Sequence, residues 1–147
     1  MNVLTNRANF TGWLVFLVTF IVYFFAVERT GSLWDCGEFV LGAYKLQIVH
    51  PPGASLFLMT GRLFTWVASL ISNNPSDIAF SVNLMSALST SIAAMCLAWM
   101  TIMLGRIMVF GRGKNPEGPA DIAVCGAGLV TGLVTAFSTS IWFSAVE

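Results

Sequence analysis

Charged side chains are scarce in this chain of 147 residues. They make up 10% of the sequence, whereas a soluble globular domain carries about 25%. The seven basic and seven acidic residues cancel to a net charge of zero, so the sequence indicates no nucleic-acid partner. The three cysteines, Cys36, Cys96 and Cys125, are odd in number, and two lie in apolar sequence. That pattern excludes a disulfide framework and a metal-binding spacing, and we expect neither a metal nor a cofactor.

Three stretches contain no charged residue at all. They cover residues 8–27, 78–105 and 122–146, which are 20, 28 and 25 residues long. A helix needs about 20 apolar residues to cross a bilayer, and 56% of the sequence is hydrophobic. The chain is therefore predicted to be an all-α, polytopic integral membrane protein. Glu28 and Arg29 follow the first stretch without the small-residue motif of a signal-peptide cleavage site, so we expect it to be a retained anchor.

A fourth apolar segment, residues 54–71, carries Arg62 in its middle. A charge at the bilayer centre is costly, which argues against a membrane span. On a helix, Arg62 shares a narrow stripe with Ser55, Thr65 and Ser69, and the remaining surface is largely apolar. The pattern predicts an amphipathic, juxtamembrane helix that lies along the interface or packs inside a helix bundle.

The distribution of basic residues predicts the orientation. Arg7 precedes the first span, and three basic residues lie between positions 105 and 121. The positive-inside rule places both segments in the cytoplasm, so two crossings separate them and the segment with Arg62 does not span. The predicted spans are about 11–27, 81–104 and 122–140, with an external loop at 28–80 and a cytoplasmic loop at 105–121.

Acidic residues gather early in the external loop. Asp35 and Glu38 are three positions apart, which places both carboxylates on one face of a helix, after a turn and cap at Gly31 and Ser32. One interpretation is that they are N-terminal acids stabilised by the helix dipole. The other is a catalytic carboxylate that takes a proton from an acceptor hydroxyl at the lipid–water boundary. Cys36 is predicted to pack rather than to react.

A rigid turn, His50-Pro51-Pro52-Gly53, follows in the same loop. Two prolines restrict the backbone, so His50 is either a ligand for a phosphate or sugar, or a capping residue of the loop. The Arg62 guanidinium suits a phosphate, and its alternative is to snorkel to the interface. The chemistry of these residue types leaves both alternatives open.

Several short motifs together resemble a known family. They are Trp34-Asp35-Cys36-Gly37-Glu38-Phe39, Tyr44-Lys45-Leu46, His50-Pro51-Pro52-Gly53, Val82-Asn83-Leu84 and Trp142-Phe143-Ser144-Ala145-Val146-Glu147. At these spacings the chain resembles the N-terminal part of a Bacteroidetes-type family of bacterial membrane proteins of formerly unknown function. That family is related to eukaryotic protein O-mannosyltransferases of the GT-C glycosyltransferase superfamily. Eukaryotic relatives often carry arginine where this chain has Ser81, and they are much longer, so we expect an N-terminal fragment.

The resemblance implies roles for individual residues. GT-C enzymes keep the catalytic carboxylate in the first external loop, which here is Asp35. Glu38 would orient it or bind the acceptor, and His50 and Arg62 would contact the donor phosphate. Glu147 matches an external acidic position of the family.

The resemblance also implies a reaction and a place. A hexose such as mannose would pass from a polyprenyl-phosphate carrier to a hydroxyl of an exported protein or glycan, at the periplasmic face of a bacterial inner membrane. The alternative is a non-enzymatic subunit, either a transporter component or a lipid-binding assembly factor. A transporter is expected to carry charges within its spans, whereas the predicted spans have none, which favours interfacial chemistry. Whether a chain of this length is active alone stays open.

Overall fold

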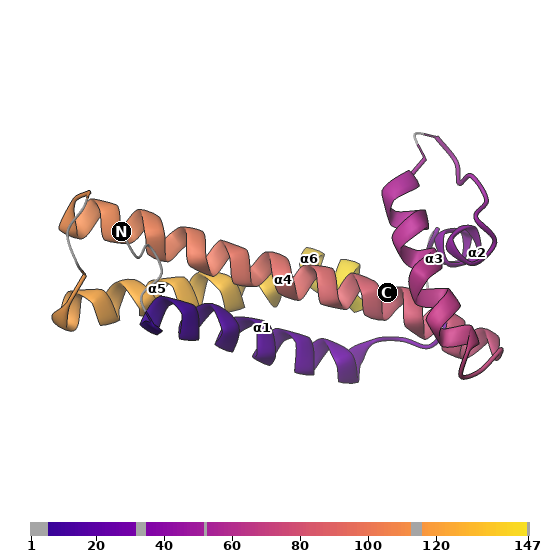
Figure 1. Cartoon of the computed structure of the whole chain (residues 1–147), viewed down its shortest axis with the longest axis horizontal. Coiled ribbons are helices and arrows are strands. Elements are labelled where there is room, and N and C mark those ends of the chain that lie inside the picture. Colours follow the sequence, from indigo (N-terminus) through magenta and orange to yellow (C-terminus); the bar gives the residue numbers. More distant parts are fainter. Residues whose placement is uncertain (1–5, 32–34, 52, 113–115, 147) are drawn as a thin grey trace. The chain divides into compact units, whose positions relative to one another are not determined.

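The computed structural model describes residues 6–31, 35–51, 53–112 and 116–146 (Figure 1). Its helices are α1 (Asn6–Ala26), α2 (Cys36–Lys45), α3 (Ser55–Ser69), α4 (Pro75–Phe110), α5 (Gly118–Ala136) and α6 (Thr139–Val146). No strand occurs among the residues described, so the all-α prediction is confirmed. By length and composition, α1, α4 and α5 are suited to cross a membrane.

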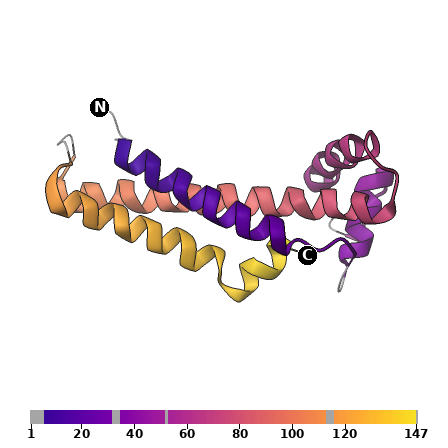
Figure 2. The same cartoon turned by 90° about the horizontal axis from the view of Figure 1, so that it is seen from below.

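The three long helices begin at Asn6, Pro75 and Gly118, a few residues before the predicted spans, and two of their C-terminal ends also differ by several residues. The predicted cytoplasmic loop began at residue 105, but α4 continues to Phe110. The charge of Arg106 is balanced by the buried carboxylate of Asp121. Oδ1 of Asp121 lies 2.8 Å from Nε and 2.7 Å from Nη2 of Arg106. The third apolar helix was predicted to reach residue 140, but α5 ends at Ala136, and a short turn leads into α6 (Figure 2).

The chain forms two compact units. The first consists of residues 1–22 and 90–142, in which parts of α1, α4 and α5 lie side by side (Figures 1 and 2). A glycine permits the close approach of α4 and α5. A Cβ at Gly128 would lie 2.5 Å from Cγ1 of Ile102 and 2.9 Å from the Ala98 carbonyl oxygen, so a larger residue cannot fit there.

The second unit consists of residues 23–89 and 143–147. Its core lies between α2, α3 and the first turns of α4, and contains Ala43, Val49, Leu58 and Val82, with Phe39, Val40, Ala54 and Phe57 packed against it. The backbone N–H of Glu28 donates to the carbonyl of Val146 at 3.0 Å. This bond ties the segment after α1 to the end of α6.

The helix α3 falls within the amphipathic segment predicted at 54–71. Its 15 residues span roughly 22 Å, which is shorter than the ~30 Å hydrocarbon core of a bilayer. Most of its polar stripe faces inward, because Thr65 is fully buried and Arg62 and Ser69 are half-buried, whereas Ser55 in the first turn is exposed. Its apolar side faces outward, where Leu56 and Leu63 are 81% and 63% exposed. This inverted arrangement is suited to an apolar environment.

Candidate functional site

Asp35 stands at the N-terminal end of α2, in the N-cap position. Its backbone carbonyl accepts the N–H of Phe39 at 3.0 Å, but among the residues described its carboxylate makes no capping hydrogen bond. The carboxylate instead faces the imidazole of His50, with Oδ2 3.7 Å from Nε2. Helix capping therefore does not account for this side chain.

Glu38 lies one turn further along α2 and binds the same histidine twice. The backbone N–H of His50 donates to Oε1 of Glu38 at 2.8 Å, and Nδ1 of the ring lies 2.9 Å from Oε2. The ring also packs edge-on against Phe39, with 6.0 Å between ring centroids. His50 is thus held between the two carboxylates that the sequence placed on one helix face.

The backbone after α2 explains how His50 returns to the start of that helix. Leu46 adopts a left-handed conformation with φ 51°, which ends α2 and reverses the chain. The returning segment passes close to the helix because Gly42 has no side chain, and a Cβ there would lie 2.9 Å from Cγ1 of Val49. The His-Pro-Pro-Gly turn then closes as Gly53, at φ 76°, donates its N–H to the His50 carbonyl at 3.0 Å.

The contacts change the acidity of both partners. The hydrogen bond from the His50 side chain, followed by the one from its backbone, lowers the pKa of Glu38 below its ordinary value. The bond to Glu38 and the negative charges of Glu38 and Asp35 raise the pKa of His50. These shifts favour an imidazolium between two carboxylates, an arrangement in which each charge stabilises its neighbour.

The same three residues offer a donor set for a metal ion, which the cysteine and histidine spacing did not predict. One ligand atom each from Asp35, Glu38 and His50 can be chosen so that all three lie within 4.8 Å of one another, and carboxylate and imidazole both bind divalent metals. However, Nδ1 of the ring faces Glu38 and Nε2 faces Asp35. Each carboxylate thus faces its own ring nitrogen, which is the arrangement of a protonated imidazole, whereas a metal ion would use one of the two nitrogens.

A cavity of about 570 Å³ opens beside Asp35. It is lined by Asp35, Cys36, Phe39, Val40, Ala54, Phe57, Val82, Asn83, Ser86, Phe143 and Ser144. The cavity is therefore bordered by three of the motifs that carry the family resemblance, those that contain Asp35, Asn83 and Phe143. Its volume lies within the range of small-molecule sites, about 300–1,000 Å³, and its walls are mostly apolar, with Asp35, Asn83 and two serines as polar groups.

The side chain of Asn83, in α4, links the segments around this cavity. No role was predicted for it from the sequence. The side chain is 1% exposed. Its amide nitrogen donates to the carbonyls of Glu28 at 3.2 Å and Thr30 at 3.4 Å, and its oxygen faces Sγ of Cys36 at 3.9 Å. The sequence does contain one signal for this role. Asn83 is the single asparagine in the charge-free stretch 78–105, and a polar side chain that is buried in such a helix requires hydrogen-bond partners.

Arg62 lies elsewhere. Its guanidinium donates to the backbone carbonyl of Tyr44 and lies over the Tyr44 ring. Tyr44 is in the last turn of α2, nine residues after Asp35, or roughly 13 Å along the helix axis. The contact satisfies one of the free carbonyls at the helix end. The structure thus brings Asp35, Glu38 and His50 together and places Arg62 at the opposite end of α2. Glu147, Trp34 and Pro52 lie outside the described residues.

The family described as the protein O-mannosyl-transferase TMEM260 N-terminal domain matches residues 35–147. The "Protein O-mannosyl-transferase tmem260" of Dictyostelium discoideum is 30% identical over 91 residues, which are 62% of this chain and 11% of that relative. No solved structure matches the chain.

The match begins at Asp35 and runs through the whole candidate site. The predicted relation to protein O-mannosyltransferases is confirmed, whereas the bacterial origin has no support among these matches. The chain spans about a tenth of the length of the Dictyostelium relative. Since the match covers most of its residues, the chain belongs to the family of the TMEM260 protein O-mannosyl-transferase N-terminal domain.

Proposed function

We propose that this chain is the N-terminal part of a membrane glycosyltransferase that uses Asp35 as its general base. The observation that carries the proposal is the position of Asp35, at the cavity of about 570 Å³ and in contact with His50. Membership of a family whose name refers to protein O-mannosyl transfer supports the reaction class. The proposed donor is a polyprenyl-phosphate-linked mannose, and the proposed acceptor is a hydroxyl of an exported protein or glycan.

The reaction would be an inverting displacement at the anomeric carbon. The Asp35 carboxylate accepts the proton of the acceptor hydroxyl, and the oxygen forms a bond to the anomeric carbon. The bond from that carbon to the phosphate oxygen breaks, and the phosphate leaves with the electron pair. A general base placed in this way accelerates a reaction about 10²–10⁴-fold.

His50 and Glu38 are proposed to position the base. Glu38 fixes the imidazole through two hydrogen bonds, and the imidazolium faces Asp35 across 3.7 Å. The positive charge faces the Asp35 carboxylate and limits its rotation, which holds it in position to accept a proton. The same charge would attract a donor phosphate, so the predicted phosphate contact of His50 is retained as a second role.

Arg62 is proposed to act through α2. Its bond to the Tyr44 carbonyl fixes the C-terminal end of the helix that carries Asp35 and Glu38 at its other end. A direct contact of Arg62 with the donor phosphate was predicted from the sequence. It stays a prediction, and the position of Arg62 at Tyr44 favours the supporting role.

The proposal is tested by transfer from a radiolabelled polyprenyl-phosphate sugar with the full-length protein. Asp35→Asn keeps the shape of the side chain but removes the proton acceptor, and the rate is expected to fall at least about 100-fold. Glu117→Gln is the matched control, because Glu117 is an exposed carboxylate outside the cavity, and it is expected to keep the wild-type rate. An Asp35→Asn protein that transfers sugar within twofold of the wild-type rate would refute the assignment.

The proposed orientation places residues 28–80 on the external side, the periplasm in a bacterial inner membrane. It follows from the basic residues near positions 7 and 105–121 and from α3, which is too short to cross the hydrocarbon core. Single cysteines at positions 60 and 72, in a protein without its native cysteines, are expected to react with a membrane-impermeant thiol reagent from the same side. Reaction of the two positions from opposite sides would show that α3 spans the membrane.

A further inference from the structure

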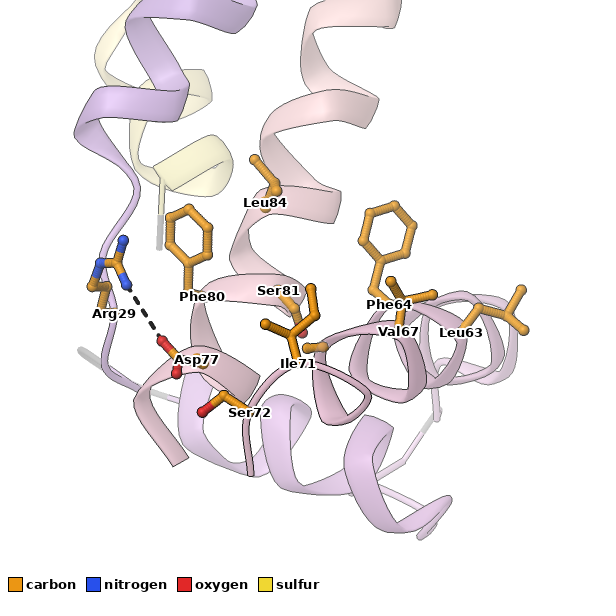
Figure 3. A pocket seen from close by; sticks show the side chains of 11 residues that line it. Arg29, Leu63, Phe64, Val67, Ile71, Ser72, Asp77, Phe80, Ser81 and Leu84 are labelled. Atoms are coloured by element: carbon orange, nitrogen blue, oxygen red, sulfur yellow. Dashed lines mark hydrogen bonds and ion pairs between the residues drawn. The ribbon is translucent and has the colours of Figure 1, made fainter. Parts of the chain in front are cut away.

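A second cavity, of about 580 Å³, lies between α3 and the first turns of α4 (Figure 3). Its walls are formed largely by apolar side chains, among them Leu63, Phe64 and Val67 from α3, Ile71 just after that helix, and Phe80 and Leu84 from α4. The groove has Arg29, Ser72, Asp77 and Ser81 as polar lining residues, but most of its surface is apolar. It is suited to a hydrocarbon chain.

The groove faces away from the candidate catalytic site. It contacts α4 at Phe80, Ser81 and Leu84, whereas the cavity beside Asp35 contacts the same helix at 82, 83 and 86. With 3.6 residues per turn, the two sets point in directions roughly 160° apart. A molecule in the groove would therefore lie across α4 from the reacting groups, so it is not a substrate.

The surroundings indicate which molecules can reach the groove. Leu63 of α3 and Ile71 just after its end line the groove and are 63% and 86% exposed, and Leu70 beside Ile71 is 69% exposed. Exposed apolar surface of this kind marks a site of contact with a membrane or a partner. The groove also borders α4, which is long and apolar enough to cross a membrane. Bilayer lipids are consequently the molecules present there at the highest concentration.

One end of the groove carries a pair of opposite charges (Figure 3). The Arg29 guanidinium lies 3.4 Å from a carboxylate oxygen of Asp77, and 4.5 Å above the ring of Phe80. Both charged side chains remain accessible, at 62% and 38% exposure. The guanidinium has further donors that suit a phosphate, and the carboxylate can accept from an ammonium group. The pair as a whole is neutral, which matches a zwitterionic headgroup better than an anionic one.

We propose that this groove binds one chain of a zwitterionic phospholipid with a primary ammonium headgroup. The phosphate meets Arg29, the ammonium donates to Asp77, and the chain lies between α3 and α4. A primary ammonium is preferred to choline, because three N–H donors can bond a carboxylate and a quaternary ammonium has none. The proposal is independent of the transferase function, since the groove and Asp35 lie on opposite faces of α4.

The test is native mass spectrometry of the full-length protein, purified in detergent and incubated with equimolar phosphatidylethanolamine, phosphatidylcholine and phosphatidylglycerol. One phosphatidylethanolamine is expected to be retained in preference. Ala68→Phe fills the groove at one of its lining residues and is expected to abolish retention. Leu70→Phe is the matched control, because it adds a similar ring at the C-terminal cap of the same helix, at a residue that does not line the groove, and it is expected to retain the lipid.

The headgroup contacts are tested separately. Arg29→Gln is expected to weaken retention of phosphatidylethanolamine about fivefold, the effect of about 1 kcal/mol for an exposed charge contact. Arg112→Gln, at an exposed arginine of the other unit, is expected to leave it unchanged. Asp77→Asn is expected to remove the preference over phosphatidylcholine.

Three outcomes would overturn the proposal. They are equal retention of the three lipids by the wild-type protein, undiminished retention by Ala68→Phe, and displacement of the lipid from the groove by added polyprenyl phosphate. If Ala68→Phe fails to fold, the wild-type protein is photolabelled with phosphatidylethanolamine carrying a diazirine on one chain. Labelled peptides are expected to contain residues 63–71 and 80–84, and labelling confined to other helices would also refute the site.

Discussion

Replacement of Asn83 by leucine tests how the candidate site is held in place. Leucine keeps the approximate volume of the side chain but removes the amide that donates to the carbonyls of Glu28 and Thr30 and the oxygen that faces Cys36. A hydrogen bond contributes about 1 kcal/mol net, and one of the two N–H bonds is long at 3.4 Å. The expected loss is therefore about 1–2 kcal/mol, a 5- to 30-fold change in the ratio of folded to unfolded protein.

The assay is unfolding of the full-length protein by titration with a denaturing detergent, followed by circular dichroism. In a background with Cys96 and Cys125 replaced by alanine, the Cys36 thiol is expected to react faster in the Asn83→Leu variant, because the amide oxygen that faces Sγ is removed. Ser89→Ala is the control, since the Ser89 hydroxyl donates within its own helix, to the carbonyl of Met85. Wild-type stability together with wild-type Cys36 reactivity would refute the idea that Asn83 organises this site.

Three further predictions concern charge and packing. Folding raises the pKa of His50, so the protonated ring stabilises the fold fully at pH values below its unfolded pKa of about 6.5. This stabilisation is lost as the pH rises through the higher pKa of the folded state. Folding lowers the pKa of Glu38, so its ionised carboxylate stabilises the fold fully at pH values above its ordinary pKa of 4.5. This stabilisation is lost as the pH falls through the lower pKa of the folded state. The contact between Glu38 and His50 is thus expected to be strongest from about pH 4.5 to 6.5. It is measured by the pH titration of the histidine NMR signals in the wild type and in Glu38→Gln. Identical titration of the two proteins would contradict the prediction. Asp121→Asn removes the carboxylate charge that faces the buried guanidinium of Arg106 and is expected to cost about 3 kcal/mol in detergent unfolding, whereas a loss below about 0.5 kcal/mol would show that the ion pair is dispensable. Gly128→Leu is expected to prevent close packing of α4 and α5, measured as loss of protease resistance, and unchanged resistance would contradict that packing.

The apolar helices could be predicted because their cause is local. A stretch without charges is visible in the sequence, and α1, α4 and α5 follow from three such stretches. Their ends could not be predicted as well. Arg106 was read as the start of a polar loop, but it stays helical because Asp121, fifteen positions later, balances its charge. A pairing over that distance depends on how the helices pack.

Part of the candidate site could be predicted because it, too, depends on residues that are close in sequence. Asp35 and Glu38 are close in sequence, and their common helix face follows from their spacing. Their contact with His50 depends on a left-handed residue, Leu46, that turns the chain back along α2. Leucine is an unusual residue for that conformation, so no pattern indicated the reversal. The position of Arg62 could not be predicted from its residue type, because a guanidinium suits a phosphate as well as it suits the carbonyl that it contacts.

The central claim is that Asp35 accepts the proton while Glu38 acts through His50. The most direct measurement is the single-turnover rate of sugar transfer by the full-length protein, with the donor already bound, for Asp35→Asn and Glu38→Gln. Asp35→Asn is expected to slow this step about 100-fold or more at unchanged donor affinity. Glu38→Gln is expected to slow it by a smaller factor, about tenfold, and to alter its pH dependence, because it only positions the base. A wild-type rate for Asp35→Asn, or a larger loss for Glu38→Gln than for Asp35→Asn, would contradict the account.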